Sequence, residues 1–398
     1  MLDKKCSIFF YEGYVGIAPT IINLAKVLSQ QSARVSIYGS KNQYAEAGEL
    51  GVGVETIYFT KGTRLFDLLI KKGFKDLVPL LELGLYVLQY FVYKAKYFQP
   101  SSQQKINVGV DIYGAIAALI NFYIFREKFL FLSLELHDPQ KFKGISRVIA
   151  DWVKIAYRKS AGLIIQDEDR FKTFCQYYNY QHPQCFYLPN SPLGFDESTV
   201  SDDFFRDKFK LSPEQFPCIV IQAGMIGDAV YSKDLAFAFN SIDNGSALVF
   251  HERQKTTGNR YTEALLKINP KNLFLSLDPL PYDQIDRIYR SATIGLAFYA
   301  DLGNNFTQIS MASGKLSQYL KYGKPVLVNN LPSLAQLINK YKIGIAIENP
   351  ADPEEIKLAI AEILGDYDTY SQNAKSCFAA EFDFAKKMQP ILSLMSVS

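Results

Sequence analysis

A lysine stands at the start of a predicted helix in the segment ASGKLSQYLKYGKPVLVNN, residues 312–330. The positive end of a helix dipole disfavours a cation at that position and favours an anion. Ser313 is a suitable N-cap, Gly314 leaves the backbone approachable, and Lys315 adds a point charge. An anion there would meet N–H donors, a dipole and an ammonium, which suits a diphosphate better than a carboxylate. Gln318 lies on roughly the same helix face, and its amide suits sugar hydroxyls. Taken alone, the residues fit an ordinary helix with solvated side chains equally well.

Two series of alternating apolar strands and helix-like segments must position these residues. A Pro- and Gly-containing stretch and a charged, Ser-rich stretch separate the two series, and we place the linker there. We expect an α/β fold of two doubly wound parallel sheets, with domains at 1–200 and 201–380 and a helix at 381–398 that crosses back to the first domain. Ligands of such sheets bind beyond the carboxyl ends of the strands. The strands are expected at Ile8–Phe10, Val35–Tyr38, Ile57–Phe59, Val108–Asp111, Phe129–Leu134 and Leu163–Gln166, then at Ile219–Gln222, Ala247–Phe250, Leu273–Leu277, Ile294–Tyr299, Val326–Val328 and Ile343–Ile347.

Composition excludes several classes of function. At 398 residues the chain exceeds a comfortable single core, and a net charge of +3 is too small to imply nucleic-acid binding. Five cysteines without a CxxC pattern favour reduced thiols in a cytosolic protein over a disulfide framework or a zinc site. The sequence has no Walker GxxxxGK[ST] motif, and no GxGxxG follows the first strand. No uncharged apolar stretch reaches the roughly 20 residues of a transmembrane helix.

The segment SGKLSQYLKYGKPVLV resembles a motif of GT-B glycosyltransferases, usually proline/small-x-Lys-Leu-x-Glu-Tyr-(Met/Leu)-Ala-x-Gly-x-Pro-Val. The following LINKYKIGIAIENPADPEEIKLAIAEIL is similar to the usual continuation, and LIIQDEDRFKTF, FYLPNSPLG and IVIQAGMIG are similar to earlier parts of the family. The likeness spans most of residues 1–380 and is weak between 60 and 105. It implies two Rossmann-like domains facing across a cleft, as in family-4-like bacterial glycosyltransferases (glycosyl transferases group 1). The C-terminal domain would bind a nucleotide-sugar and the N-terminal domain an acceptor, with no cofactor and no metal.

The resemblance supports Lys315 at the diphosphate and Gln318 at the donor, beside Ser313 and Gly314. The retaining family-4 enzymes usually carry Glu-x7-Glu, and here Ser310 and Gln318 take those two positions. Retention or inversion of the anomeric centre therefore stays open. Further donor contacts are expected from residues at or just past strand ends, each with an ordinary structural role as the alternative: Gly224, Lys233, His251, Arg253 and Tyr299.

A catalytic base should come from the N-terminal domain, where GT-B enzymes hold the acceptor. Asp111 ends the strand VGVD and Glu135 ends the next strand pattern, so both are candidates, with helix capping as the alternative. Gly13 and Gly16 belong to the first strand-to-helix loop, YEGYVG, and are expected on the acceptor side or in a simple tight turn.

Residues 64–98 form an apolar, aromatic segment edged by lysines. One interpretation is an amphipathic segment on an anionic membrane surface, and the other is a pair of core-packed helices with solvated lysines. We expect a cytoplasmic glycosyltransferase of polysaccharide or glycolipid assembly, with a saccharide or lipid-linked acceptor and with peripheral contact to the inner face of the cell membrane as an option. The alternatives are a sugar-nucleotide epimerase of the same fold and a non-catalytic carbohydrate- or membrane-associated relative.

Overall fold

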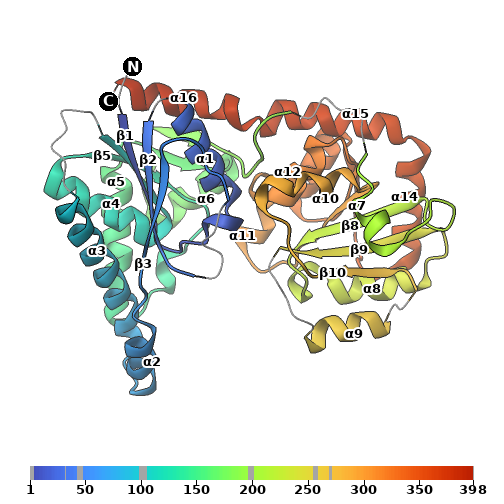
Figure 1. Ribbon diagram of the computed structural model, residues 1–398, viewed down its shortest axis with the longest axis horizontal. Coiled ribbons are helices and arrows are strands. Elements are labelled where there is room, and N and C mark those ends of the chain that lie inside the picture. The colour runs from blue at the N-terminus through green and yellow to red at the C-terminus, as the bar shows by residue number, and fades with distance from the viewer. Residues whose placement is uncertain are drawn as a thin grey trace. The chain divides into compact units, whose positions relative to one another are not determined.

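The computed structural model describes residues 4–31, 33–42, 48–97, 105–195, 201–253, 259–268 and 271–397. The chain divides into two compact units (Figure 1): unit 1 comprises Met1–Pro189 and Ala385–Ser398, and unit 2 comprises Asn190–Phe384. The division thus falls at Pro189, earlier than the boundary expected at residue 200. Residues 196–200 and residue 98, which the predictions include, lie outside the described residues.

In the described part of the chain, unit 1 contains a seven-stranded parallel sheet of order β3-β2-β1-β4-β5-β6-β7. Its strands are β1 (Lys4–Phe10), β2 (Ala33–Ser40), β3 (Val54–Phe59), β4 (Lys105–Val110), β5 (Lys128–Leu132), β6 (Leu163–Ile165) and β7 (Cys185–Tyr187). Its helices are α1 (Pro19–Gln30), α2 (Thr63–Lys71), α3 (Val78–Lys96), α4 (Asp111–Phe125), α5 (Arg147–Lys159), α6 (Glu168–Tyr178) and α16 (Phe384–Val397), with short turns η1 (Val15–Ile17), η2 (Lys75–Leu77), η3 (Pro139–Lys141) and η4 (Gly144–Ser146).

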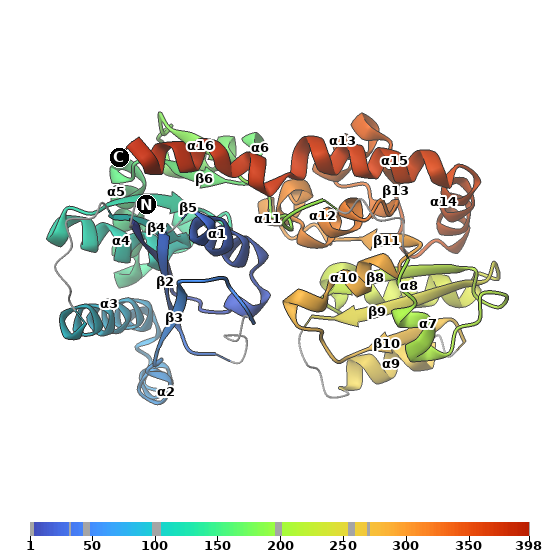
Figure 2. The ribbon, with the colours of Figure 1, turned by 45° about the horizontal axis from the view of Figure 1, so that its top comes forward.

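One face of this sheet is covered by α3, α4, α5 and α6, whose aromatic and aliphatic side chains form a single core cluster with the strands. Tyr86 and Tyr90 of α3 are fully buried in that cluster, against Phe9 and Tyr38 of the sheet. Leu394 of α16 packs near β4 and β5. Figure 2 shows α2 at the periphery of unit 1, beyond the sheet.

Unit 2 contains a six-stranded parallel sheet of order β10-β9-β8-β11-β12-β13 in its described residues. Its strands are β8 (Cys218–Gly224), β9 (Ser246–Glu252), β10 (Leu273–Ser276), β11 (Ile294–Ala297), β12 (Val326–Asn329) and β13 (Gly344–Ile347). Its helices are α7 (Phe204–Phe209), α8 (Ser232–Ser241), α9 (Arg260–Ile268), α10 (Asp286–Arg290), α11 (Asn304–Thr307), α12 (Gly314–Lys321), α13 (Pro332–Tyr341), α14 (Pro353–Gly365) and α15 (Tyr367–Cys377), with short turns η5 (Asp228–Val230), η6 (Tyr282–Gln284), η7 (Ser310–Ala312) and η8 (Phe378–Phe382).

Separate core clusters line the two faces of the second sheet. One packs α7, α10, α12 and α13 against it, and the other packs α8, α9 and α14. The predicted fold class is therefore confirmed: the chain is α/β, with two parallel sheets that carry helices.

The strand order reverses beside β1 and β4 in unit 1, and beside β8 and β11 in unit 2. In a doubly wound sheet, the loops after the two strands at such a switch point diverge and leave room for a ligand. Asp111 directly follows β4, and Lys315 lies in α12, the helix that precedes β12 and follows the loop after β11.

Candidate functional site

The start of α12 is built around Ser313, which is the helix N-cap as the sequence predicts. Its hydroxyl accepts the Leu316 N–H at 3.2 Å. The same turn is tied to Asn190, whose backbone N–H donates to Met311 O at 2.8 Å and whose carbonyl accepts the Ser317 hydroxyl at 2.8 Å. These bonds fix the N-terminal turn of α12, so the N–H groups of that turn are held in one orientation.

Tyr319 seats α12 on the sheet. Its fully buried ring lies over Gly295 of β11, where an added Cβ would come within 2.3 Å of the ring. The Tyr319 hydroxyl donates to Ile221 O at 2.6 Å and accepts the Ala223 N–H at 3.0 Å, near the end of β8. The helix is thereby anchored to both strands that flank the switch point of unit 2.

Lys315 is a partly buried cation at this position. Its Nζ lies 3.5 Å from Phe298 O and 4.4 Å from the centre of the Tyr299 ring. Burial, and then the positive charge of Arg253, lower the pKa of Lys315 to about 7. No carboxylate of the described residues forms an ion pair with Lys315 or Arg253, so this position can accept an anion.

Tyr299 holds this lysine and does not offer an open stacking face. Its hydroxyl hydrogen-bonds the Ser313 hydroxyl, and its backbone exchanges two bonds with the Asn329 side chain at 3.0 and 2.8 Å. Burial raises the Tyr299 pKa well above its ordinary value, so the ring stays neutral. Lys315 occupies one face of the ring, which makes Tyr299 a positioning residue for the ammonium.

Gln318 carries an unfulfilled hydrogen-bonding group. Its side chain is buried, and its Oε1 has no hydrogen-bond partner among the described residues. Such an atom is costly unless a ligand or water satisfies it.

Gly224 ends β8 with φ of +113° and open space around it, and its carbonyl accepts the Arg253 N–H at 3.0 Å. Ser310 is buried in η7, and its N–H donates to Ser333 Oγ at 3.4 Å.

Two of the predicted donor residues are engaged elsewhere. Lys233 of α8 pairs with Asp228 at 3.7 Å and lies over the Tyr261 ring at 4.6 Å. His251 does not follow the strand as expected but lies inside β9, buried, with Nδ1 2.9 Å from Ser276 Oγ. Burial, and then the charge of Lys208, lower the pKa of His251 to about 4, so it is a neutral core residue.

Unit 1 places Asp111 at its own switch point. The residue follows β4 and begins α4 with φ of +50°, a left-handed backbone that a non-glycine residue seldom adopts and that is often found at functional sites. Its buried Oδ1 accepts the N–H groups of Leu134 and Glu135 at 2.8 and 3.1 Å. These bonds favour the ionised carboxylate, although burial raises the Asp111 pKa overall.

Glu12 lies at the same switch point, in the loop that follows β1. Burial raises its pKa first, and the negative charge of Asp111 raises it further. Its Oε2 is buried without a hydrogen-bond partner among the described residues. Asp111 receives two N–H bonds and Glu12 Oε2 receives none, so Glu12 is the member that holds a proton more readily.

Arg170 of α6 is fully buried, and its charge reaches Asp111. It donates to Leu134 O at 3.0 Å, and its charge acts on Glu135, Asp167 and Asp111. Glu135 itself is exposed in the loop after β5. Arg170 thus fixes the loop whose N–H groups bind Asp111.

His137 extends this cluster, with its Nε2 3.9 Å from Asp111 Oδ1. Burial lowers the His137 pKa, which favours the neutral imidazole. Of the other histidines, His182 is buried against Ser160 and His251 is in the core of unit 2. Only His137 is therefore placed near candidate catalytic groups.

The two glycines of the first loop differ. Gly13 has φ of +70°, and a Cβ there would come within 2.0 Å of Ser40 O, so glycine is required by close approach of two backbones. Gly16 lies within η1, half-buried. The described residues contain no group of three or more His, Cys, Asp and Glu side chains arranged to hold a metal ion.

Comparison with known proteins finds similarity in structure and not in sequence. No family model and no curated protein matches the chain. It has the GT-B fold, the fold of several solved glycosyltransferases. Sucrose-phosphate synthase from Thermosynechococcus elongatus matches with a TM-score of 0.70 at 14% identity, covering 99% of this chain and all of that one. HepE from Anabaena, solved with UDP-glucose, matches with a TM-score of 0.67 at 13% identity, covering 99% of this chain and all of that one. WaaG, a glycosyltransferase of lipopolysaccharide biosynthesis, matches with a TM-score of 0.63 at 13% identity, covering 98% of each chain.

Proposed function

We propose that the protein is a glycosyltransferase of the hexosyltransferase type, which moves a sugar from a nucleotide-sugar bound by unit 2 to a saccharide or lipid-linked acceptor bound by unit 1. The observation that carries the proposal is Lys315: a partly buried cation at a helix N-terminus, beside the charge of Arg253, with no ion-pair partner among the described residues. A nucleoside diphosphate supplies the missing negative charge. The structures of HepE with UDP-glucose, UDP, and UDP and glucose support a donor of this class.

Unit 2 would assist by stabilising the leaving group. As the glycosidic bond breaks, negative charge grows on the diphosphate, and Lys315 and the fixed N–H groups of α12 would meet that charge. Gln318 would present its unpaired Oε1 to a hydroxyl of the donor. We propose that no metal and no cofactor is needed, because these groups provide the positive charge.

Unit 1 would handle the acceptor proton. Asp111 is the proposed base: burial raises its pKa to about 6, and two N–H groups and the charge of Arg170 favour its carboxylate form. The proton accepted from the acceptor hydroxyl would stay on Asp111, because the neighbouring Glu12 is the carboxyl that already holds a proton more readily. This assignment leaves the stereochemical outcome to experiment.

A cytoplasmic location with peripheral membrane contact through residues 64–98 completes the proposal, for polysaccharide or glycolipid assembly. Large apolar side chains are exposed here: Leu68 and Ile70 of α2, and Leu88 and Val92 of α3. Lys94 lies apart from that contact, because it is half-buried and pairs with Glu127 at 3.2 Å.

Among the described residues, one helical segment, Lys75–Lys96, is long and apolar enough to cross a membrane by length and composition, with mean hydropathy 1.2 and 22% of it buried. Core helices of soluble proteins pass the same test, and Tyr86 and Tyr90 pack this helix into unit 1. A helix packed into unit 1 in this way can touch the surface of a membrane without crossing it.

The test is a thermal-shift screen of UDP, GDP, ADP, CMP and dTDP conjugates, followed by donor hydrolysis and transfer assays. At least one nucleotide should stabilise the wild-type protein, and Lys315→Ala should abolish the shift. Lys357→Ala is the matched control, since Lys357 is an exposed lysine of α14. If no nucleotide stabilises the protein, the transferase assignment fails; if Lys315→Ala keeps full activity, the assignment of the diphosphate site fails.

A further inference from the structure

Helix α5 of unit 1 has two apolar faces. The inner face, with Ile149, Val153 and Tyr157, is buried in the core. The outer stripe begins at Ile145 in η4, which is 60% exposed, and continues through Val148, Trp152 and Ile155, which are 40%, 41% and 41% exposed. Their spacing of three and four residues places these four side chains on one side of the helix. A surface helix of a soluble protein needs only the inner face, so the outer stripe indicates a partner.

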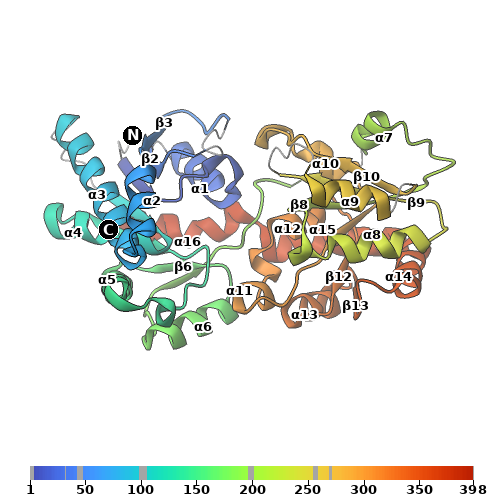
Figure 3. The same ribbon diagram turned by 90° about the horizontal axis from the view of Figure 1, so that it is seen from below.

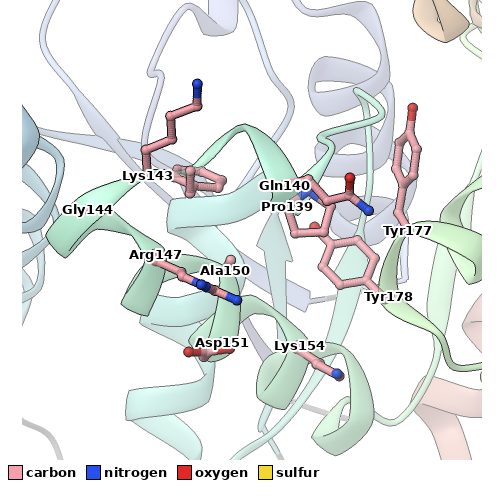
Figure 4. Close-up of a pocket in the computed structure, with 11 residues that line it drawn as sticks. Pro139, Gln140, Lys143, Gly144, Arg147, Ala150, Asp151, Lys154, Tyr177 and Tyr178 are labelled. Atoms are coloured by element: carbon pink, nitrogen blue, oxygen red, sulfur yellow. The ribbon is translucent and has the colours of Figure 1, made fainter.

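A basic groove of about 530 Å³ runs beside this stripe. Arg147, Lys154 and Lys143 line it, together with Tyr177 and Tyr178 of α6. Figure 4 shows Arg147 and Lys154 extending from α5 toward the side that carries Gln140 and Tyr178. No described carboxylate forms an ion pair with any of these three cations, although Asp151 also lines the groove.

Neighbouring helices extend the same surface. Figure 3 shows α3, α4 and α5 along one side of unit 1, and α4 contacts both of the others. The C-terminal turn of α4 exposes Tyr123, Ile124 and Phe125. Apolar side chains beside unpaired cations match a surface that is apolar below and negatively charged above, which is the boundary of an anionic bilayer.

We propose that the outer face of α5 binds the surface of an anionic phospholipid bilayer. Arg147 and Lys154 take a headgroup phosphate into the groove, while Val148, Trp152 and Ile155 enter the layer beneath the headgroups. Trp is enriched at that depth because its ring is apolar and its N–H is polar. The proposal shares with the proposed function only the expectation of membrane contact, adds a segment outside residues 64–98, and does not depend on donor binding.

Trp152 is the only tryptophan in the chain, so its fluorescence reports on α5 alone. The full-length protein is titrated with vesicles of phosphatidylcholine, with and without 30 mol% phosphatidylglycerol (roughly a natural anionic content), and with vesicles carrying brominated acyl chains. We expect a blue shift of emission and quenching by the brominated chains, both with anionic vesicles only. Inorganic phosphate should give no blue shift, which separates a headgroup in a bilayer from free phosphate.

Matched charge variants test the groove. Each basic residue near an anionic surface raises the partition coefficient of a protein onto vesicles about fivefold. The double variant Arg147→Gln/Lys154→Gln should therefore lower the partition coefficient onto anionic vesicles about 25-fold. Lys267→Gln/Lys357→Gln, which removes the same charge from exposed helices of unit 2, should change it less than about twofold.

Three outcomes overturn the proposal. Vesicle co-sedimentation without a change in Trp152 emission would assign membrane contact to another segment. Equal partitioning of the two double variants would remove the groove from the interaction. Emission that is already blue-shifted without lipid and reverts on dilution would mean that a second copy of the chain covers α5. None of these outcomes bears on nucleotide binding, which the thermal-shift screen tests separately.

Discussion

Replacing Lys315 with methionine should stabilise the folded protein while it weakens nucleotide binding. The pKa of Lys315 is about 7 in the folded protein, against an ordinary value of 10.5. At 1.36 kcal/mol per pKa unit, this difference sets a ceiling of about 5 kcal/mol on the free energy lost by holding the cation there. Because the side chain is only partly buried, solvent screens the charge, and we expect a gain of about 1 to 2 kcal/mol for Lys315→Met.

The stability gained by Lys315→Met should be larger at low pH than at high pH. Below pH 7 the lysine is protonated in both the folded and the unfolded state, so the wild-type protein bears the full destabilisation. As the pH rises from 7 toward 10.5, the folded state loses the proton first, and the wild-type unfolding free energy rises. Urea unfolding at pH 6 and pH 9 should therefore show a larger advantage of Lys315→Met at pH 6.

Nucleotide binding should show the opposite effect. A charge-assisted hydrogen bond to the diphosphate is worth about 1.5 to 3 kcal/mol, so the variant should bind UDP, or whichever nucleotide the screen selects, roughly 10- to 100-fold more weakly. Wild-type affinity should fall above pH 7 as the free lysine loses its proton, and calorimetry in two buffers should detect proton uptake on binding. The variant should show neither effect. A variant that is less stable at pH 6 and binds the nucleotide as tightly as wild type would refute the reasoning.

Three further substitutions test the two switch points. Asp111→Asn keeps an acceptor for the two N–H groups but removes the base, so turnover should fall about 10²- to 10⁴-fold with little change in the melting temperature. Glu12 has a raised pKa, so wild-type stability should fall as the pH rises above the ordinary value of 4.5; Glu12→Gln should flatten that decline in urea unfolding. Gly295→Ala would press a methyl group against the Tyr319 ring, and we expect a loss of about 1 to 3 kcal/mol together with weaker nucleotide binding. Gly365→Ala, with open space around it, is the control and should change neither.

The sequence predicted most of the fold because buried parallel strands leave short, strongly apolar runs between helices. All twelve predicted strands correspond to strands of the two sheets. The strand β7, Cys185–Tyr187, shows no clear pattern because only its central residue is buried, whereas the equally short β6 is apolar and buried throughout. The sequence places His251 in a loop, but the strand β9 continues through it. Because side chains alternate along a strand, His251 lies on the same face of the sheet as the buried Val249.

The candidate sites were less predictable because they depend on contacts between distant loops. The capping role of Ser313 could be predicted locally, but the Tyr299 ring beneath Lys315 could not. Glu12 was overlooked beside Gly13, since nothing in YEGYVG indicates that Asp111 lies nearby in space. Arg170 was overlooked as well, because an arginine in a helix is most often solvated and this one is fully buried.

The two sheets carry ionisable groups of opposite kinds at the same topological position. At the switch point of unit 1, two buried carboxylates interact so that one of them retains a proton more readily. At that of unit 2, a lysine with a lowered pKa lies beside an arginine. Neither arrangement stabilises its own unit, because like charges repel and burial disfavours each charged form. Groups with shifted pKa values of this kind cluster at functional sites. The proposed glycosyl transfer would use both kinds: a proton acceptor for the incoming hydroxyl and a positive charge for the departing diphosphate.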